Sequence, residues 1–185
     1  MHKPPPAPGH STATAHSLDA EVAVEDDRWR SHPEIEIDVQ RAIAALLSCQ
    51  PELVRYPAAV TIVLSDDSRV AALNGDFRAR PQPTNVLSFP AHESATEPGS
   101  PPYLGDIIIA RETVEREAGD AGIPVSHHLQ HLTIHGLLHL LGYDHQSDAE
   151  AELMEAVETR VLHTLGIADP YTETSDKTSP ATTQN

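Results

Sequence analysis

Apolar residues recur three and four positions apart in five stretches of the chain, a spacing that predicts amphipathic helices. The first stretch, residues 33–48, opens at Pro33, which suits a first helical turn. The second follows the helix-start signal Ser65-Asp66-Asp67 and continues through Val70, Leu73 and Phe77. The other three predicted helices span residues 111–121, 126–141 and 148–165, with Ser126 expected as an N-cap.

Short runs rich in β-branched and apolar residues predict strands. They span residues 21–24, 59–64, 85–89 and 106–110. Residues 90–103, rich in Pro, Ser and Glu, are expected to form a loop. Strands concentrate in the first two-thirds of the chain and helices in the last third. This order predicts an α+β fold, with a small mixed sheet of about four strands covered by helices.

The two ends of the chain lack any periodic apolar face. Residues 1–18 are rich in Pro, Ala and His, and residues 171–185 are rich in Thr and Ser. Both are expected to be disordered tails. The remaining residues, 19–170, are the right length for a single domain.

The net charge of −16 argues against a broad nucleic-acid-binding surface, which is usually basic. The acidic residues are unevenly distributed along the chain, however. Residues 21–27 and 144–158 are strongly acidic, while residues 78–82 contain two arginines and no acidic residue. A locally basic groove on an acidic body is therefore compatible with the sequence. The chain has one cysteine, no secretory signal and no apolar run of about 18 residues, so we expect a cytoplasmic protein without a membrane partner.

Three histidines have the spacing of a metal site. His135 and His139 are four apart, which places them on one helix face. Gly142 then allows a sharp turn that returns His145 to the same ion. Three protein ligands and an open position are typical of catalytic zinc, so we expect one Zn²⁺ per chain, on a helix and its following turn.

One position departs from the zinc proteases that share this spacing. They place a glutamate directly after the first histidine as general base, and here that residue is Gly136. A glycine costs a helix about 1 kcal/mol relative to alanine, and close approach of backbone or substrate would explain it. Without that glutamate, the chemistry left to the site is activation of water by the metal itself, which is suited to attack on a phosphodiester.

Other polar residues near these ligands have two readings. His127 and His131 continue the helical stripe, either as a polar face or as groups that orient the ligands. Asp144 either hydrogen-bonds a ligand ring or shapes the turn, and we favour the turn.

The segment HGLLHLLGYDH closely resembles the signature of the YbeY family of bacterial endoribonucleases. The segments 83–90 (PTNVLSFP) and 104–107 (LGDI) resemble two further family segments. The resemblance implies a metal-dependent, single-strand-specific ribonuclease. It would act in maturation of the 3′ end of small-subunit rRNA and in ribosome quality control, with the small subunit and assembly factors as partners and without DNA as substrate.

The resemblance also implies site residues. The three zinc ligands fall on His135, His139 and His145, and a functionally important arginine falls on Arg78, with Arg80 as a further substrate-binding candidate. Guanidinium groups bind phosphate in a bidentate way. Pro81 and Gln82 stand where many relatives have Asp and Lys, which reduces the basic character of this loop.

Two other functions stay open. A ribosome-assembly factor with a mainly structural metal would suit the acidic surface. A metalloprotease or other hydrolase would suit the histidine spacing, although Gly136 opposes it.

Overall fold

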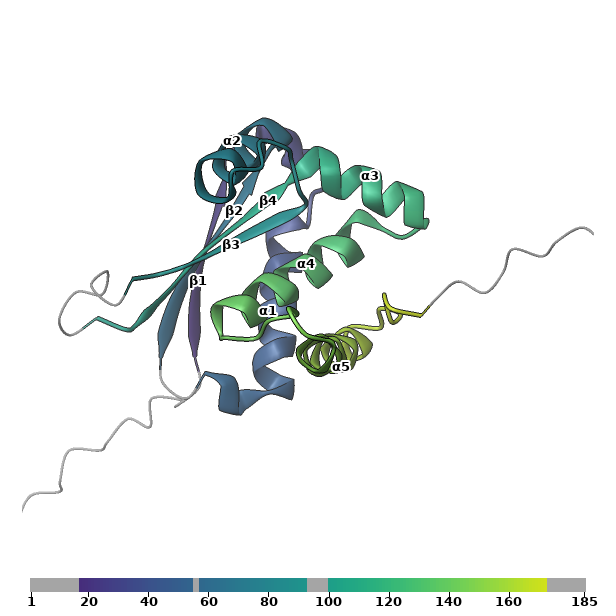
Figure 1. The fold of residues 1–185 in the computed structure, drawn as a ribbon. Helices are drawn as coiled ribbons and strands as arrows, with labels where there is room; N and C mark the ends of the chain where they lie inside the picture. Colours follow the sequence, from purple (N-terminus) through teal and green to yellow (C-terminus); the bar gives the residue numbers. More distant parts are fainter. Residues whose placement is uncertain (1–16, 55–56, 93–99, 173–185) are drawn as a thin grey trace, which may run out of the picture.

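The computed structural model describes residues 17–54, 57–92 and 100–172, apart from the side chain of Arg78. In this part of the chain, four strands form one sheet in the order β1-β2-β4-β3 (Figure 1). β1, β2 and β4 run parallel, and β3 pairs antiparallel with β4 at the edge, so the predicted mixed sheet is confirmed. The strands are β1 (Leu18–Val24), β2 (Ala58–Ser65), β3 (Val86–Pro90) and β4 (Tyr103–Ala110).

Five α-helices accompany the sheet, and each was predicted from the apolar spacing. They are α1 (Ile35–Cys49), α2 (Asp67–Arg78), α3 (Arg111–Ala121), α4 (Val125–Leu140) and α5 (Asp148–Thr164), with short 3-10 turns η1 (Asp27–Ser31) and η2 (Pro51–Leu53). The expected N-cap at Ser126 is wrong. α4 starts one residue earlier, after Pro124, and no side chain caps its first turn. None of the helices in these ranges is long and apolar enough to cross a bilayer.

The division into one domain at residues 19–170 and two tails stays a prediction, and the structure describes residues at both of its edges. β1 opens at Leu18, the last residue of the expected N-terminal tail, because Leu18 pairs with Ala58. Tyr171, the first residue of the expected C-terminal tail, also has defined contacts, given below. The rest of both expected tails, residues 1–16 and 173–185, and the centre of the expected loop, 93–99, lie outside the described residues.

Alternation along the strands gives the sheet two apolar faces. Ile107 and Ile109 of β4 point into the larger core, which α1, α4 and α5 cover. Ile108 and Ala110 point the other way, into a small cluster with Val70 of α2. The metal-site helix α4 therefore lies on the larger core, and α2 closes the opposite face (Figure 1).

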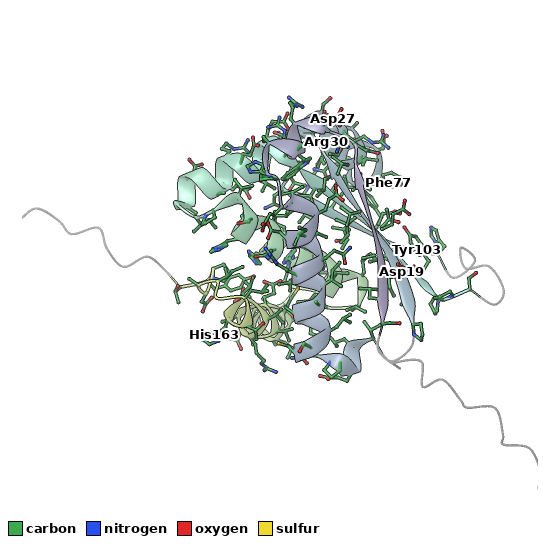
Figure 2. All side chains as sticks on the ribbon, turned by 180° about the vertical axis from the view of Figure 1, so that it is seen from behind. Asp19, Asp27, Arg30, Phe77, Tyr103 and His163 are labelled. Atoms are coloured by element: carbon green, nitrogen blue, oxygen red, sulfur yellow. The ribbon has the colours of Figure 1, made fainter. Side chains whose placement is uncertain are left out.

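Phe77 differs from the other apolar residues of α2. Its side chain is 69 % exposed, and its ring meets Phe89 edge-on with centroids 5.1 Å apart. Figure 2 shows Phe77 at the periphery of the molecule, beside the sheet. The apolar spacing of α2 thus extends one turn beyond the buried part of the helix.

Close packing of α4 on the sheet explains the glycine that departs from the protease pattern. A Cβ atom at Gly136 would lie 2.8 Å from Cγ2 of Ile107 and 3.2 Å from Oγ of Ser88. The Ser88 hydroxyl also donates to the Gly136 carbonyl at 3.2 Å. The position does need space, but the expectation that backbone or substrate approaches it is wrong, because the approaching groups are side chains of β4 and β3.

This packing predicts opposite effects for two helical glycines. Gly136→Ala should lower the free energy of unfolding by up to about 2 kcal/mol, because overpacking costs about 1–3 kcal/mol and a helix-propensity gain of about 1 kcal/mol offsets only part of it. Gly119→Ala in α3 is the matched control, since a Cβ there meets nothing within 4 Å. It should raise stability by up to about 1 kcal/mol. Equal gains for both variants in urea unfolding would contradict the packing account.

Candidate metal centre

Three imidazoles converge where α4 ends. His135 and His139 lie on successive turns of α4, and His145 lies in the segment before α5. Ring centroids are 4.6 Å apart for His135–His139, 5.0 Å for His139–His145 and 5.7 Å for His135–His145. One nitrogen from each ring lies within 4.8 Å of the others, so a single ion could bind all three. The structure therefore brings together the three residues that the spacing singled out.

The turn after α4 is a Schellman motif, which satisfies the last carbonyls of the helix. The Tyr143 N–H donates to the Leu138 carbonyl at 2.9 Å, and the Gly142 N–H donates to the His139 carbonyl at 3.1 Å. Gly142 has φ 93°, in the left-handed region that glycine adopts without strain. The sharp turn expected at Gly142 is confirmed, and it is what returns His145 toward the helix.

The same turn determines which nitrogen of His139 is free. Nδ1 lies 3.1 Å from the Tyr143 carbonyl oxygen. A carbonyl can only accept, so Nδ1 carries the proton and Nε2 carries the lone pair. Burial, together with the neighbouring His135 ring, lowers the pKa of His139 and keeps the ring neutral, as a metal ligand must be.

His135 is oriented from the other side, by α5. Its Nδ1 lies 2.8 Å from Oε1 of Glu158, a residue with no exposed surface. Burial by itself would raise the pKa of Glu158, but hydrogen bonds from His131, His135 and Tyr171 lower it to about 2. The carboxylate is therefore ionised at neutral pH and accepts a hydrogen bond from the Nδ1–H group, which leaves Nε2 of His135 with its lone pair.

Two nitrogen lone pairs consequently face each other. The Nε2 atoms of His135 and His139 are 3.1 Å apart, and each ring has its one proton bonded to an oxygen elsewhere. Two acceptors at this distance are stabilised by a cation between them. Tetrahedral zinc with bonds of about 2.0–2.1 Å would hold its nitrogens about 3.3 Å apart, so the residues fit that ion. Other divalent metals that prefer imidazole fit the same donor set.

The imidazoles open onto a cleft of about 1010 Å³. One wall is β3 and the segment before it, which contribute Asn85, Val86, Ser88 and Pro90. The other wall is α4 with its turn. Among the described side chains that line the cleft, Arg80 is the only lysine or arginine. A bound substrate would thus lie between the edge strand and the metal ligands.

The remaining candidates from the sequence take different places. Arg80 and Asp144 line the cleft. Asp144 Oδ1 accepts from the His145 backbone N–H at 2.8 Å, the turn-shaping contact that was favoured. His131 lies behind the ligands, 3.1 Å from Glu158. Arg78 ends α2 just before the cleft-lining segment, but its side chain lies outside the described part of the structure.

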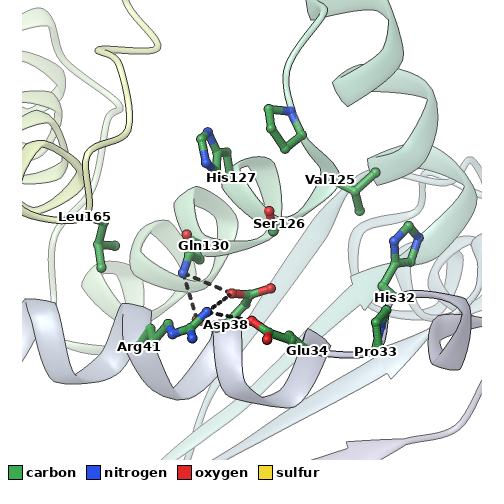
Figure 3. Close-up of a pocket in the computed structure, with 11 residues that line it drawn as sticks. His32, Pro33, Glu34, Asp38, Arg41, Val125, Ser126, His127, Gln130 and Leu165 are labelled. Atoms are coloured by element: carbon green, nitrogen blue, oxygen red, sulfur yellow. Dashed lines mark hydrogen bonds and ion pairs between the residues drawn. The ribbon is translucent and has the colours of Figure 1, made fainter.

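A second hollow, about 710 Å³, lies between α1 and the start of α4 (Figure 3). Its carboxylates, Glu34 and Asp38, both pair with Arg41, at 3.0 and 3.1 Å. The buried amide of Gln130 also faces Asp38. These groups are paired with one another, and among the described residues the clusters that could hold an ion lie instead around His135.

Two residues of the centre were missed in the sequence. Glu158 lies on the buried stripe of α5 among apolar neighbours, and Tyr171 falls in the expected tail. The signal that could have found Glu158 is a lone acid at a core position of a helix, because buried charges are almost always paired.

Known proteins resemble the chain over most of its length. A family model described as "Endoribonuclease YbeY" matches residues 23–166. A relative named "Endoribonuclease YbeY" from Rhodopseudomonas palustris (strain BisA53) is 48 % identical over 155 residues, covering 83 % of this chain and 90 % of the relative. One of the same name from Ruegeria pomeroyi is 46 % identical over 164 residues, covering 82 % and 97 %.

The fold also matches a solved structure. The solution structure of TM1509 from Thermotoga maritima superposes with a TM-score of 0.51 at 22 % identity, covering 83 % of this chain and 99 % of that one. At this identity the likeness concerns the fold alone. The family model and the close relatives go further: the chain belongs to the YbeY family of endoribonucleases.

Proposed function

We propose that the chain is a zinc-dependent endoribonuclease specific for single-stranded RNA, with one Zn²⁺ held by His135, His139 and His145. The observation that carries this proposal is the pair of Nε2 atoms of His135 and His139, 3.1 Å apart in the lining of an open cleft. Family membership supplies the substrate class, since the relatives are named endoribonucleases. The cellular task is maturation of the 3′ end of small-subunit rRNA and ribosome quality control in the cytoplasm, with the small subunit and assembly factors as partners and no DNA substrate.

A zinc ion in this centre supplies Lewis acidity that makes water nucleophilic near neutral pH. The chain itself positions the reaction. Asn85, Ser88 and Arg80 line the same cleft as the ligands, where a phosphodiester would lie. Arg78 is proposed to bind the scissile phosphate or to stabilise the charge that develops on it. Arg80 is proposed to bind the adjacent sugar-phosphate backbone of the RNA. Such local cations are compatible with a net charge of −16, because the reacting phosphate senses its immediate surroundings.

The packing at Gly136 weighs against a protease. A glutamate in that position would have to displace Ile107 of β4, so the general base of the zinc proteases has no room here. A ribosome-assembly factor with a mainly structural metal is the stronger alternative. It is favoured by the acidic composition and by the way the histidines connect α4, its turn and α5.

Removing one of the three ligands tests the role of the metal. His139→Ala should remove bound zinc, measured by inductively coupled plasma mass spectrometry of protein purified without chelator. Cleavage of a fluorescent single-stranded RNA should fall by more than the roughly 100-fold that loss of a ligand-supporting group costs. His163→Ala is the matched control, since His163 is exposed at the outer end of α5 (Figure 2). Zinc-loaded wild type that leaves RNA intact would contradict the proposal.

Removing the guanidinium group tests the proposed role of Arg78. Arg78→Ala should lower kcat by about 100-fold or more, the cost of removing one transition-state donor, with zinc content and melting temperature unchanged. Arg69→Ala is the control, because Arg69 is exposed on the same helix. If Arg78→Ala cleaves RNA and supports growth normally while His135→Ala unfolds, the metal is structural and the assembly-factor alternative holds.

A further inference from the structure

One buried acid joins the metal centre to the C-terminal end of the domain. Glu158 of α5 has no exposed surface, yet its two carboxylate oxygens have three hydrogen-bond partners. Oε1 is 2.8 Å from Nδ1 of His135, while Oε2 is 3.1 Å from Nε2 of His131 and bonds the Tyr171 hydroxyl. The partners come from α4 and from the segment after α5, so they meet only in the folded chain.

The surroundings of Glu158 suit an apolar side chain. Its neighbours along the same stripe of α5, Met154, Val157 and Val161, are all buried in the main core. Replacing a buried ionic group by a well-packed apolar one often leaves a protein equally or more stable. Packing therefore gives no reason for a carboxylate here, and its contact with a ligand of the proposed metal does.

We propose that Glu158 is a positioning residue for the metal centre, and that Tyr171 and His131 hold it in place. The proposal rests on the function proposed above. A carboxylate that accepts from Nδ1 of a ligand imidazole selects the tautomer, fixes the ring plane and increases the basicity of Nε2. The Tyr143 carbonyl oxygen orients His139 in the same way, at 3.1 Å from its Nδ1 atom. A neutral carbonyl is a weaker acceptor than a carboxylate.

Tyr171 and His131 hydrogen-bond to Oε2 of Glu158, the carboxylate oxygen that His135 does not contact. The Tyr171 ring stands edge-on to His131 with centroids 5.9 Å apart. Asp169 holds the segment in turn, because its Oδ1 accepts from the Tyr171 backbone N–H at 2.9 Å and from Oγ1 of Thr159 at 3.2 Å. Because both of its oxygens are hydrogen-bonded, the carboxylate is held in one orientation. Residues 169–171 therefore help to position the ligand His135 through Glu158.

The same atoms could instead bind a second cation, since His131, His135 and Glu158 have ligand atoms within 4.8 Å of one another. Hydrogen bonding is favoured over a second ion. The carboxylate is fully buried, and its bonds to two ring nitrogens and a hydroxyl already satisfy both oxygens. The proposal therefore requires one zinc per chain.

The test is zinc affinity, measured by competition with a chromophoric chelator on the full chain. Glu158→Gln keeps the shape but loses the charge, and should raise the Kd for zinc by about 10–100-fold. Tyr171→Phe should raise the Kd for zinc by a smaller factor. It leaves the core intact, so it replaces Glu158→Gln as the test variant if Glu158→Gln fails to fold. Glu152→Gln, exposed on the same helix, is the matched control and should leave the Kd unchanged.

A merely structural role gives a different result. The apo and zinc-loaded forms of Glu158→Gln would then lose melting temperature equally, with the wild-type Kd retained, and this would overturn the proposal. Two zinc ions per wild-type chain would also overturn it. The zinc titration uses no RNA, so the two proposals can fail separately. If the wild type binds one zinc but cleaves no RNA, and Glu158→Gln still raises the Kd, the proposed function is refuted while this inference stands. Wild type that binds no zinc would refute both.

Discussion

Each helix-borne imidazole at the cleft has one ring nitrogen left to offer, because the other already donates to an oxygen. For His139 the oxygen is the Tyr143 carbonyl, and for His135 it is the buried carboxylate of Glu158. The two remaining lone pairs lie 3.1 Å apart. This arrangement is unfavourable without a cation and favourable with one, so the tautomers set by the surrounding fold define the site.

The rest of the fold supports that constraint. The sheet gives α4 an apolar surface, and Gly136 lets the helix lie close against Ile107. Because α4 packs closely on the sheet at Gly136, the edge strand β3 lies near the ligands, and the cleft forms between them. The turn at Gly142 ends the helix, frees the chain to return His145, and supplies the carbonyl that orients His139. One short segment thus carries out three tasks that would otherwise need separate elements.

Much of this could be predicted from the sequence, because it depends on local pattern. Apolar periodicity predicted all five helices, short runs rich in β-branched residues predicted the four strands, and the spacing of His135, His139 and His145 predicted their convergence. Long-range contacts could not be predicted in the same way. Glu158 lies 23 positions from His135 in the chain, and only the packing of α5 on α4 brings them together.

Gly136 and Ser126 show two further limits of local pattern. Gly136 was recognised as a position that needs space, but the neighbour that takes the space, Ile107, is set by the docking of the helix on the sheet. Ser126 has the composition of an N-cap, yet α4 starts at Val125 because Pro124 can precede the first turn without a side-chain cap. Helix ends depend on backbone geometry that residue preferences describe only on average.

The most direct measurement of the central claim is zinc K-edge X-ray absorption spectroscopy on protein loaded with one equivalent of zinc. The account predicts a shell of nitrogen and oxygen at about 2.0–2.1 Å, with outer-shell scattering from three imidazoles in the wild type and two in His145→Ala. A sulfur shell at about 2.3 Å, or wild-type spectra fitted by fewer than three imidazoles, would contradict it.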